Sequence, residues 1–162
     1  MLYKYIKIIN PPSKIRGIIR GSFSRKRMDK MTKELLVESA QKVKENTYSP
    51  YSKFPVGAAL LMKDGTIING VNVENVSFGA TNCAERTAVF TAITNGYKKG
   101  DFQAIAIAGD TEDFLPPCCI CRQVLAELCT PEMPVYLTNN KKDILEIPLK
   151  ELLPYAFTDL DM

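Results

Sequence analysis

The sequence contains no histidine among its 162 residues. This absence excludes serine–histidine triads, histidine general bases and histidine metal ligands, so proton transfer near neutral pH must use a carboxylate, a cysteine, a lysine or metal-bound water. The chain also lacks any apolar run close to the ~20 residues that a membrane-spanning helix needs, and we recognise no secretory signal. Its five cysteines therefore favour a metal site in a reducing compartment, the cytoplasm, over disulfides.

Acidic side chains are missing from residues 1–27, which hold eight lysines and arginines. The rest of the chain has 13 basic and 18 acidic side chains, so its net charge is −5 although the whole chain carries +3. A core of this charge predicts no nucleic-acid partner. We expect residues 1–30 to be a basic N-terminal extension: a disordered arm, an organelle-targeting segment, or sequence upstream of a start at Met28 or Met31. Residues 31–162 should form one domain with its own core.

Hydrophobic periodicity predicts helices that alternate with strands. Apolar residues at roughly 3.6 spacing predict a helix over 33–46 with Thr32 as its N-cap, and Asp64-Gly65 predicts a hairpin. The remaining predicted helices are 83–95, 118–128 and 149–153, and the predicted strands are 56–63, 67–73, 102–108, 135–137 and 144–147. Strands with helices on both sides indicate the α/β class, as a three-layer α-β-α sandwich around a mixed, mostly five-stranded sheet.

The most informative feature is a pair of cysteine motifs, Cys83-Ala84-Glu85 and Pro117-Cys118-Cys119-Ile120-Cys121. Cys118 and Cys121 are spaced i, i+3, which places both sulfurs on one face of a helical turn, as a tetrahedral zinc requires. Cys83 opens another predicted helix, so two helix N-termini would converge on one ion. Cys129 lies ~12 Å further along its helix and Cys119 is turned ~100° away, so we expect both to be small buried apolar residues. Three ligands leave a zinc position open, as catalytic sites do.

Glu85 has two readings from spacing alone. It is either a first-turn glutamate that the helix dipole favours or a proton carrier beside the metal. Residues i and i+2 of a regular helix point ~200° apart, so Glu85 meets the metal only if Cys83 is an N-cap with non-helical backbone angles. Three thiolates on Zn²⁺ leave a negative site whose charge Arg86, and to a lesser degree Arg122, could balance. The alternative for Arg86 is an ordinary helix-surface arginine.

Together with Asn72-Val73-Glu74-Asn75, Leu152-Leu153-Pro154 and the block 51–59, these motifs resemble cytidine deaminases of the homotetrameric three-cysteine type. The resemblance spans about residues 30–157. It implies a hydrolase that holds one Zn²⁺ per subunit through Cys83, Cys118 and Cys121. The implied reaction converts cytidine and 2′-deoxycytidine to uridine and 2′-deoxyuridine with release of ammonia, in pyrimidine salvage. Glu85 would carry the protons.

The resemblance also implies the substrate-binding residues. Asn72 and Glu74, which share one side of a strand, would hold ribose hydroxyls, and Phe54 would pack on the base or sugar. Phe157 would reach into a neighbouring subunit's pocket. The other implied substrate contacts are Val73, Asn75, Val76, Ser77, Phe78 and Ala84. Without the resemblance, core packing would explain Phe54, and an exposed strand edge would explain Asn72 and Glu74.

Two departures from the family pattern matter. Phe78 stands where a tyrosine is expected, which removes a hydroxyl, and Cys119-Ile120 replaces a pair of small residues between the ligands. Two rival functions remain. One is a deaminase of the same fold that acts on another cytosine nucleoside such as blasticidin S. The other is a non-catalytic module in which zinc only stabilises the fold.

Overall fold

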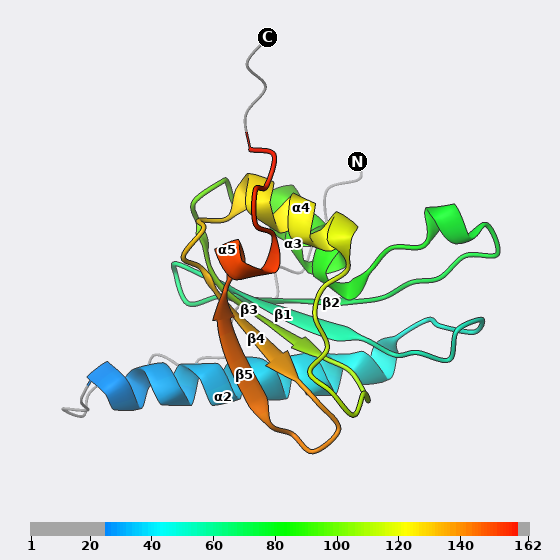
Figure 1. Cartoon of the computed structure of the whole chain (residues 1–162), viewed down its shortest axis with the longest axis horizontal. Helices are drawn as coiled ribbons and strands as arrows, with labels where there is room; N and C mark the ends of the chain where they lie inside the picture. Colours follow the sequence, from blue (N-terminus) through cyan, green and yellow to red (C-terminus); the bar gives the residue numbers. More distant parts are fainter. Residues whose placement is uncertain (1–24, 159–162) are drawn as a thin grey trace, which may run out of the picture.

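The computed structural model describes residues 25–158 and arranges them in three layers around one sheet (Figure 1). The strand order is β2-β1-β3-β4-β5. Only β3 and β4 run parallel, and the other neighbours are antiparallel. The bounds are β1 (Gly57–Met62), β2 (Ile67–Val71), β3 (Phe102–Ala108), β4 (Pro134–Thr138) and β5 (Ile144–Pro148). This mixed five-stranded sheet confirms the predicted fold class.

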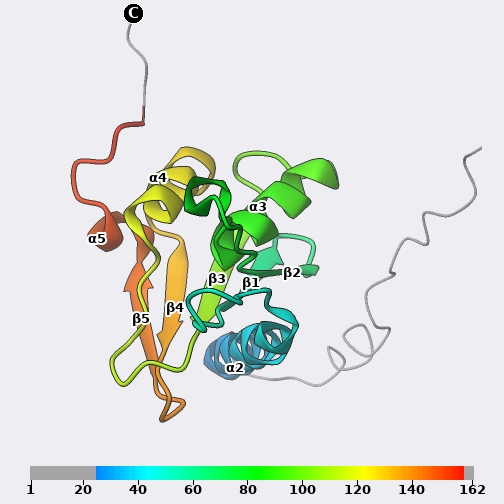
Figure 2. The same cartoon turned by 90° about the vertical axis from the view of Figure 1, so that its right-hand side faces the viewer.

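Helix α2 (Arg25–Val43) covers one face of the sheet, and α3 (Ala84–Thr94), α4 (Cys119–Leu128) and α5 (Leu149–Leu152) cover the other (Figures 1 and 2). Side chains alternate between the two faces along each strand. In β1, Leu60 packs in the cluster under α3 and α4, whereas Ala59 packs in the cluster under α2. The sheet therefore has a hydrophobic core on each side. No helix in the described range is both long and apolar enough to cross a membrane.

The predicted elements are present with shifted ends. The hairpin at Asp64-Gly65 is confirmed, with Gly65 at a φ of 87°. Thr32 as an N-cap is wrong, because α2 already begins at Arg25. Apart from Asp29, residues 25–30 are good helix formers, and the segment has no glycine or proline, so nothing stops the helix before Thr32. The expected boundary between residues 30 and 31 therefore falls inside α2, and the predicted extension lies outside the described residues up to position 24.

Gly70 in β2 brings α3 unusually close to the sheet. A Cβ atom at this position would lie 2.3 Å from the carbonyl oxygen of Ala84 and 2.4 Å from the backbone nitrogen of Ala88. Any larger residue would push the first turns of α3 away from the sheet. The absence of a side chain at Gly70 thus allows the start of α3 to lie close against the sheet.

Candidate active site

Cys83 stands immediately before α3 and is its N-cap residue. Its backbone is extended, with φ −78° and ψ 158°, so the ~200° divergence expected for i and i+2 inside a helix does not apply. Cys83 and Glu85 consequently line the same cavity. Cys83 is thus an N-cap with non-helical backbone angles, which is the condition under which we expected Glu85 to lie beside the metal site.

The second cysteine pair is delivered in the same way. Cys118 is the N-cap of α4, with φ −65° and ψ 164°, and Cys121 lies in the first turn. The sulfurs of Cys83, Cys118 and Cys121 all lie within 4.8 Å of one another, and those of Cys83 and Cys118 are 3.8 Å apart. Two sulfurs on a tetrahedral zinc with ~2.3 Å bonds are ~4 Å apart, so the trio fits such an ion.

The two other cysteines do not join this cluster, as predicted. Cys129 is the C-cap of α4 and is buried, so the expectation of a small apolar residue is confirmed. Cys119 is exposed, so the expectation of burial is wrong for it. The first turn of α4 lies at the outer surface, and the ~100° turn that takes Cys119 away from the sulfurs leads it outward instead of into the core.

Arg86 supplies positive charge beside the ligands. Its Nη2 lies 3.4 Å from Cys83 Sγ and donates to the Thr81 carbonyl oxygen at 3.2 Å. The pKa of Cys83 is lowered by a hydrogen bond from Cys121 and by Arg86, whereas the hydrogen bond to Cys83 raises the pKa of Cys121. The Nε of Arg86 is buried without a hydrogen-bond partner among the described residues. A partly buried guanidinium with an unpartnered nitrogen is best balanced by thiolates, which is the state of metal-ligating cysteines.

Arg122 does not repeat this arrangement. Its Nε donates to the carbonyl oxygen of Pro117 at 2.7 Å, and its Nη1 donates to that of Leu152 at 2.9 Å. Within residues 25–158, no hydrogen bond joins Arg122 to a ligand sulfur. Arg122 therefore ties the segment before Cys118 to the end of α5, and its effect on the charge of the site stays a prediction.

Glu85 is buried beside the sulfurs, with 4% of its surface exposed. Burial raises the pKa of Glu85 to about 7. A carboxyl group with such a pKa can both accept and donate a proton near neutral pH. Glu85 does lie in the first turn of α3, where the helix dipole favours an acidic side chain, so its part as a proton carrier stays a prediction.

A cavity of about 310 Å³ joins the sulfurs to the predicted substrate contacts. The predicted residues in its wall are Phe54, Asn72, Glu74, Phe78, Cys83, Ala84, Glu85 and Cys118. The structure does not bring Val73, Asn75, Val76 or Ser77 into this wall, and Val76 is 82% exposed. The strand-like alternation that turns Asn72 and Glu74 inward turns Val73 outward. Sequence reasoning gave Ser52, which lines the cavity, no role, although Ser52 lies in the block 51–59.

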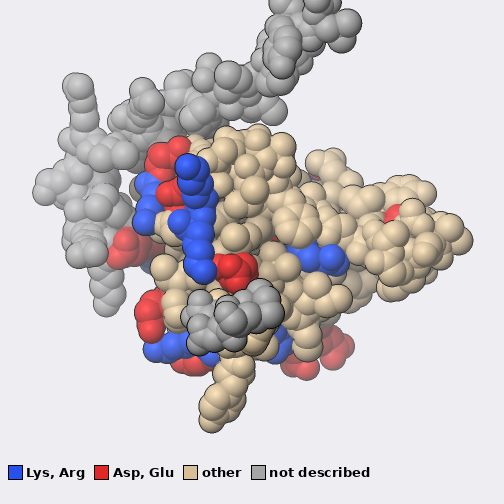
Figure 3. All heavy atoms as spheres, turned by 90° about the horizontal axis from the view of Figure 1, so that it is seen from above, with Lys and Arg blue, Asp and Glu red and all other residues tan. Residues whose placement is uncertain are grey.

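Phe157 lies outside the cavity wall of its own chain and is 64% exposed. Its carbonyl oxygen accepts a hydrogen bond of 2.7 Å from Gln123 Nε2 on α4. On the face that carries α3 and α4, the charged side chains gather to one side, and the loops projecting on the other side are mainly uncharged (Figure 3). The structure thus leaves Phe157 free to contact another molecule.

The sequence of this chain is similar to those of known deaminases. The model of a family described as the cytidine and deoxycytidylate deaminase zinc-binding region matches residues 30–137. Curated cytidine deaminases of Halalkalibacterium halodurans and Sporosarcina psychrophila are 54% and 52% identical to this chain over 132 residues. These alignments cover 82% of this chain, 98% of the first relative and 96% of the second.

A solved structure of the same family has a similar fold. The crystal structure of cytidine deaminase from Burkholderia pseudomallei matches this chain with a TM-score of 0.75 at 48% identity, over 76% of this chain and 98% of that one. A blasticidin-S deaminase of Bacillus cereus is more distant, at 32% identity over 115 residues, which cover 66% of this chain and 79% of that protein.

Proposed function

The chain belongs to the cytidine and deoxycytidylate deaminase family, and we propose that it deaminates cytidine and 2′-deoxycytidine hydrolytically, with release of ammonia. The observation that carries the proposal is the buried carboxyl group of Glu85 in one cavity with the cysteine sulfurs. Asn72 and Glu74 line the same cavity, where the side-chain amide of Asn72 and the carboxylate of Glu74 can form hydrogen bonds with a sugar. The core charge of −5 favours a single nucleoside over a polynucleotide.

The metal site fits zinc, since it combines three sulfurs at suitable separations with a neighbouring guanidinium. Cys83, Cys118 and Cys121 would hold the ion, and zinc bound there supplies a water activated for attack at neutral pH. Arg86 offsets part of the charge of the thiolates. The Cys83–Arg86 contact stabilises the deprotonated ligand, which is the form that binds metal.

Glu85 moves the protons in this proposal. Its carboxylate would accept a proton from the attacking water and pass it to the ring nitrogen of cytosine. It would then take the remaining proton of the new hydroxyl group on the ring carbon and deliver it to the amino group, which leaves as ammonia while the carbonyl forms. One group can do both because burial holds its pKa near 7. Phe54 packs on the nucleoside, and Asn72 and Glu74, which line the same cavity, orient the sugar.

A homotetramer is the proposed assembly, with Phe157 entering the pocket of a neighbouring subunit. Support comes from the exposed aromatic side chains of Phe78 and Phe157, at 61% and 64% exposure. Burial of these side chains against another copy would stabilise the assembly. Light scattering of the purified chain should give four times the mass of one chain, and a monomer at micromolar concentration would contradict the assembly. The cytoplasmic location stays a prediction.

The decisive experiment follows the loss of absorbance at the cytosine band with the zinc-loaded protein. Cytidine, 2′-deoxycytidine, cytosine and blasticidin S are assayed in parallel, with ammonia measured independently. We expect ammonia from both nucleosides. Turnover of blasticidin S alone would favour the rival deaminase, and zinc binding without any turnover would favour a non-catalytic module.

A further inference from the structure

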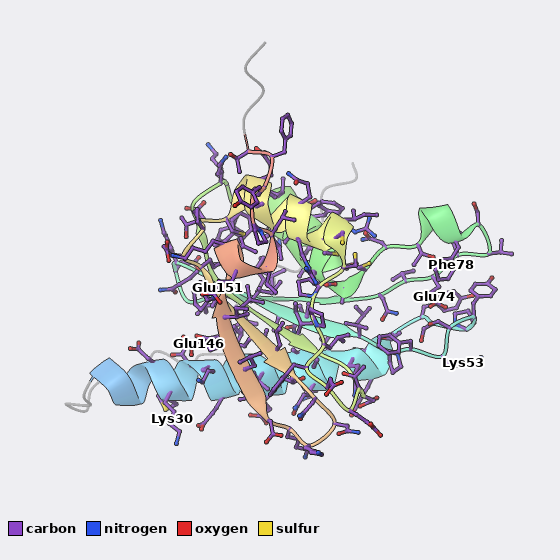
Figure 4. The ribbon with its side chains drawn as sticks, viewed as in Figure 1. Lys30, Lys53, Glu74, Phe78, Glu146 and Glu151 are labelled. Atoms are coloured by element: carbon purple, nitrogen blue, oxygen red, sulfur yellow. The ribbon has the colours of Figure 1, made fainter. Side chains whose placement is uncertain are left out.

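We propose that Ser52 is a positioning residue of the sugar site, which leaves the Asn72–Glu74 pair complementary to a single sugar hydroxyl. This inference rests on the proposed function, because it assigns Ser52 a part in nucleoside binding. Ser52 lies on the loop before β1, and Glu74 lies on the segment after β2. Figure 4 shows Glu74 and Lys53, the neighbour of Ser52, on two adjacent projecting loops.

The Glu74 carboxylate is held mainly by the loop that contains Ser52. Its Oε2 accepts the backbone N–H groups of Tyr51 at 3.0 Å and Ser52 at 3.1 Å. Its Oε1 accepts the Ser52 hydroxyl. These hydrogen bonds, the one from the Ser52 hydroxyl first, lower the pKa of Glu74 and keep it ionised. An ionised carboxylate has about two acceptor sites on each oxygen, so Oε2 is saturated and Oε1 retains one.

The side-chain amide of Asn72 is also nearly saturated. Its Oδ1 accepts the backbone N–H of Val56 at 2.8 Å and the Thr47 hydroxyl at 3.2 Å. Its Nδ2 donates one hydrogen to the Phe54 carbonyl oxygen at 2.9 Å. The amide has two hydrogens on this nitrogen, so one N–H remains. Asn72 and Glu74 thus have one donor and one acceptor left for a ligand, which matches one hydroxyl.

Ser52 connects this pair to the rest of the cavity wall. Its hydroxyl oxygen accepts the backbone N–H of Phe54 at 3.0 Å while its hydrogen goes to Glu74. Lys53 between them has a φ of 57°, which an L-residue adopts only when its surroundings enforce it. The Ser52 hydroxyl therefore holds Glu74 Oε1, while two backbone N–H groups hold Oε2, and the same hydroxyl also supports the path of the chain to Phe54.

Ser52 is exposed, so its removal should disturb the fold little. Without the hydroxyl, Glu74 Oε1 loses the bond that fixes its direction, and the carboxylate gains freedom to turn away from the sugar. The loss should therefore appear only with ligands that have the hydroxyl in question, whereas a general effect on the loop would weaken all nucleosides alike.

The test compares Ser52→Ala with wild type on cytidine, 2′-deoxycytidine, 3′-deoxycytidine and 2′,3′-dideoxycytidine. We expect kcat/KM with cytidine to fall about tenfold, as for a hydrogen bond to a charged group, mainly through KM. With 2′,3′-dideoxycytidine it should not change. Of the two singly deoxygenated nucleosides, the one that keeps the bound hydroxyl should lose about tenfold in kcat/KM, as cytidine does. The one that lacks this hydroxyl should be unaffected, like the dideoxy compound. An equal loss on all four, or sensitivity of both singly deoxygenated nucleosides, overturns the proposal.

Two further variants sharpen the test. Ser52→Thr keeps a hydroxyl and should restore the KM for cytidine. Ser39→Ala on α2 is the matched control, because it removes a serine hydrogen bond of 2.9 Å to Asn69 Oδ1 on the sheet's other side; it should retain wild-type kinetics. If wild type deaminates no nucleoside, the proposed function fails. Calorimetric binding of uridine and its 2′,3′-dideoxy analogue to wild type and Ser52→Ala then still decides the role of Ser52 by the same pattern.

Discussion

The starts of α3 and α4 share the same local backbone geometry but differ in how deeply their first residues are buried. Each helix has an extended N-cap cysteine, Cys83 in one and Cys118 in the other, and neither cap residue makes a side-chain capping bond. The first two residues of α3 are buried, and Glu85 is 4% exposed, whereas Ile120 at the same position of α4 is 62% exposed. The local sequence thus forms a ligand-bearing helix start, and packing on β2 decides which start can also hold a buried acid.

The largest expected effect separates these two equivalent positions. Glu85→Gln removes the proton carrier, and turnover of cytidine should fall about 10²–10⁴-fold, the usual contribution of general acid–base catalysis. Ile120→Ala should change turnover less than about threefold, because Ile120 does not line the cavity. Ammonia release and zinc content are measured for both variants. Wild-type turnover by zinc-loaded Glu85→Gln would remove Glu85 from the mechanism.

The close contact of α3 with β2 is tested at Gly70. Gly70→Ala places a Cβ atom 2.3 Å from the Ala84 carbonyl oxygen, and we expect a loss of about 3 kcal/mol or more in unfolding free energy. Gly79 is the control, since a Cβ atom there meets nothing within 4 Å; Gly79→Ala should shift stability by less than about 0.5 kcal/mol. Urea titrations measure both, and equal stabilities would show that α3 tolerates displacement.

The far end of α4 should determine part of the alkaline stability. Burial raises the pKa of Cys129 from its ordinary 9.0 to about 12, so the folded state holds this proton more tightly than the unfolded state. The contribution is complete below pH 9 and is lost as the pH rises towards 12. At pH 11 we expect the free energy of unfolding to have fallen by about 3 kcal/mol from this group.

Cys129→Val removes the titrating thiol while it keeps an apolar side chain of similar size. Its stability should decline less steeply than that of wild type between pH 9 and 11, as measured by urea titrations at several pH values. Identical slopes for the two proteins would contradict the assignment to Cys129.

The smallest effect distinguishes the two arginines. Arg86→Gln removes the guanidinium beside Cys83 Sγ, and zinc transfer to a chelator should become about tenfold faster, as for other groups that support metal ligands. Arg122→Gln should change this rate less than about threefold. Instead it should speed amide exchange over residues 149–157, because the Leu152 carbonyl loses its partner. The opposite assignment of the two effects would reverse the roles given to these arginines.

Some features of the fold and the site could be predicted from the sequence, and others could not. The pairing of Cys118 with Cys121 followed from their i, i+3 spacing, and the five strands followed from apolar runs. The burial of Cys119 and the N-cap at Thr32 were predicted wrongly. Both depend on what lies beyond the helix itself, namely the open surface at the start of α4 and the helix-forming residues that precede Thr32.

By itself, the sequence determined which side chains were available: three cysteines at metal spacing, an acid next to the first of them, and no histidine to replace either. Only the tertiary structure decided that Glu85 is buried beside the sulfurs, that Arg86 and not Arg122 touches a ligand, and that Ser52 holds Glu74. The reason is physical. Spacing along one helix or strand fixes local direction, but burial and hydrogen-bond partners are set by segments that meet only when the sheet is assembled.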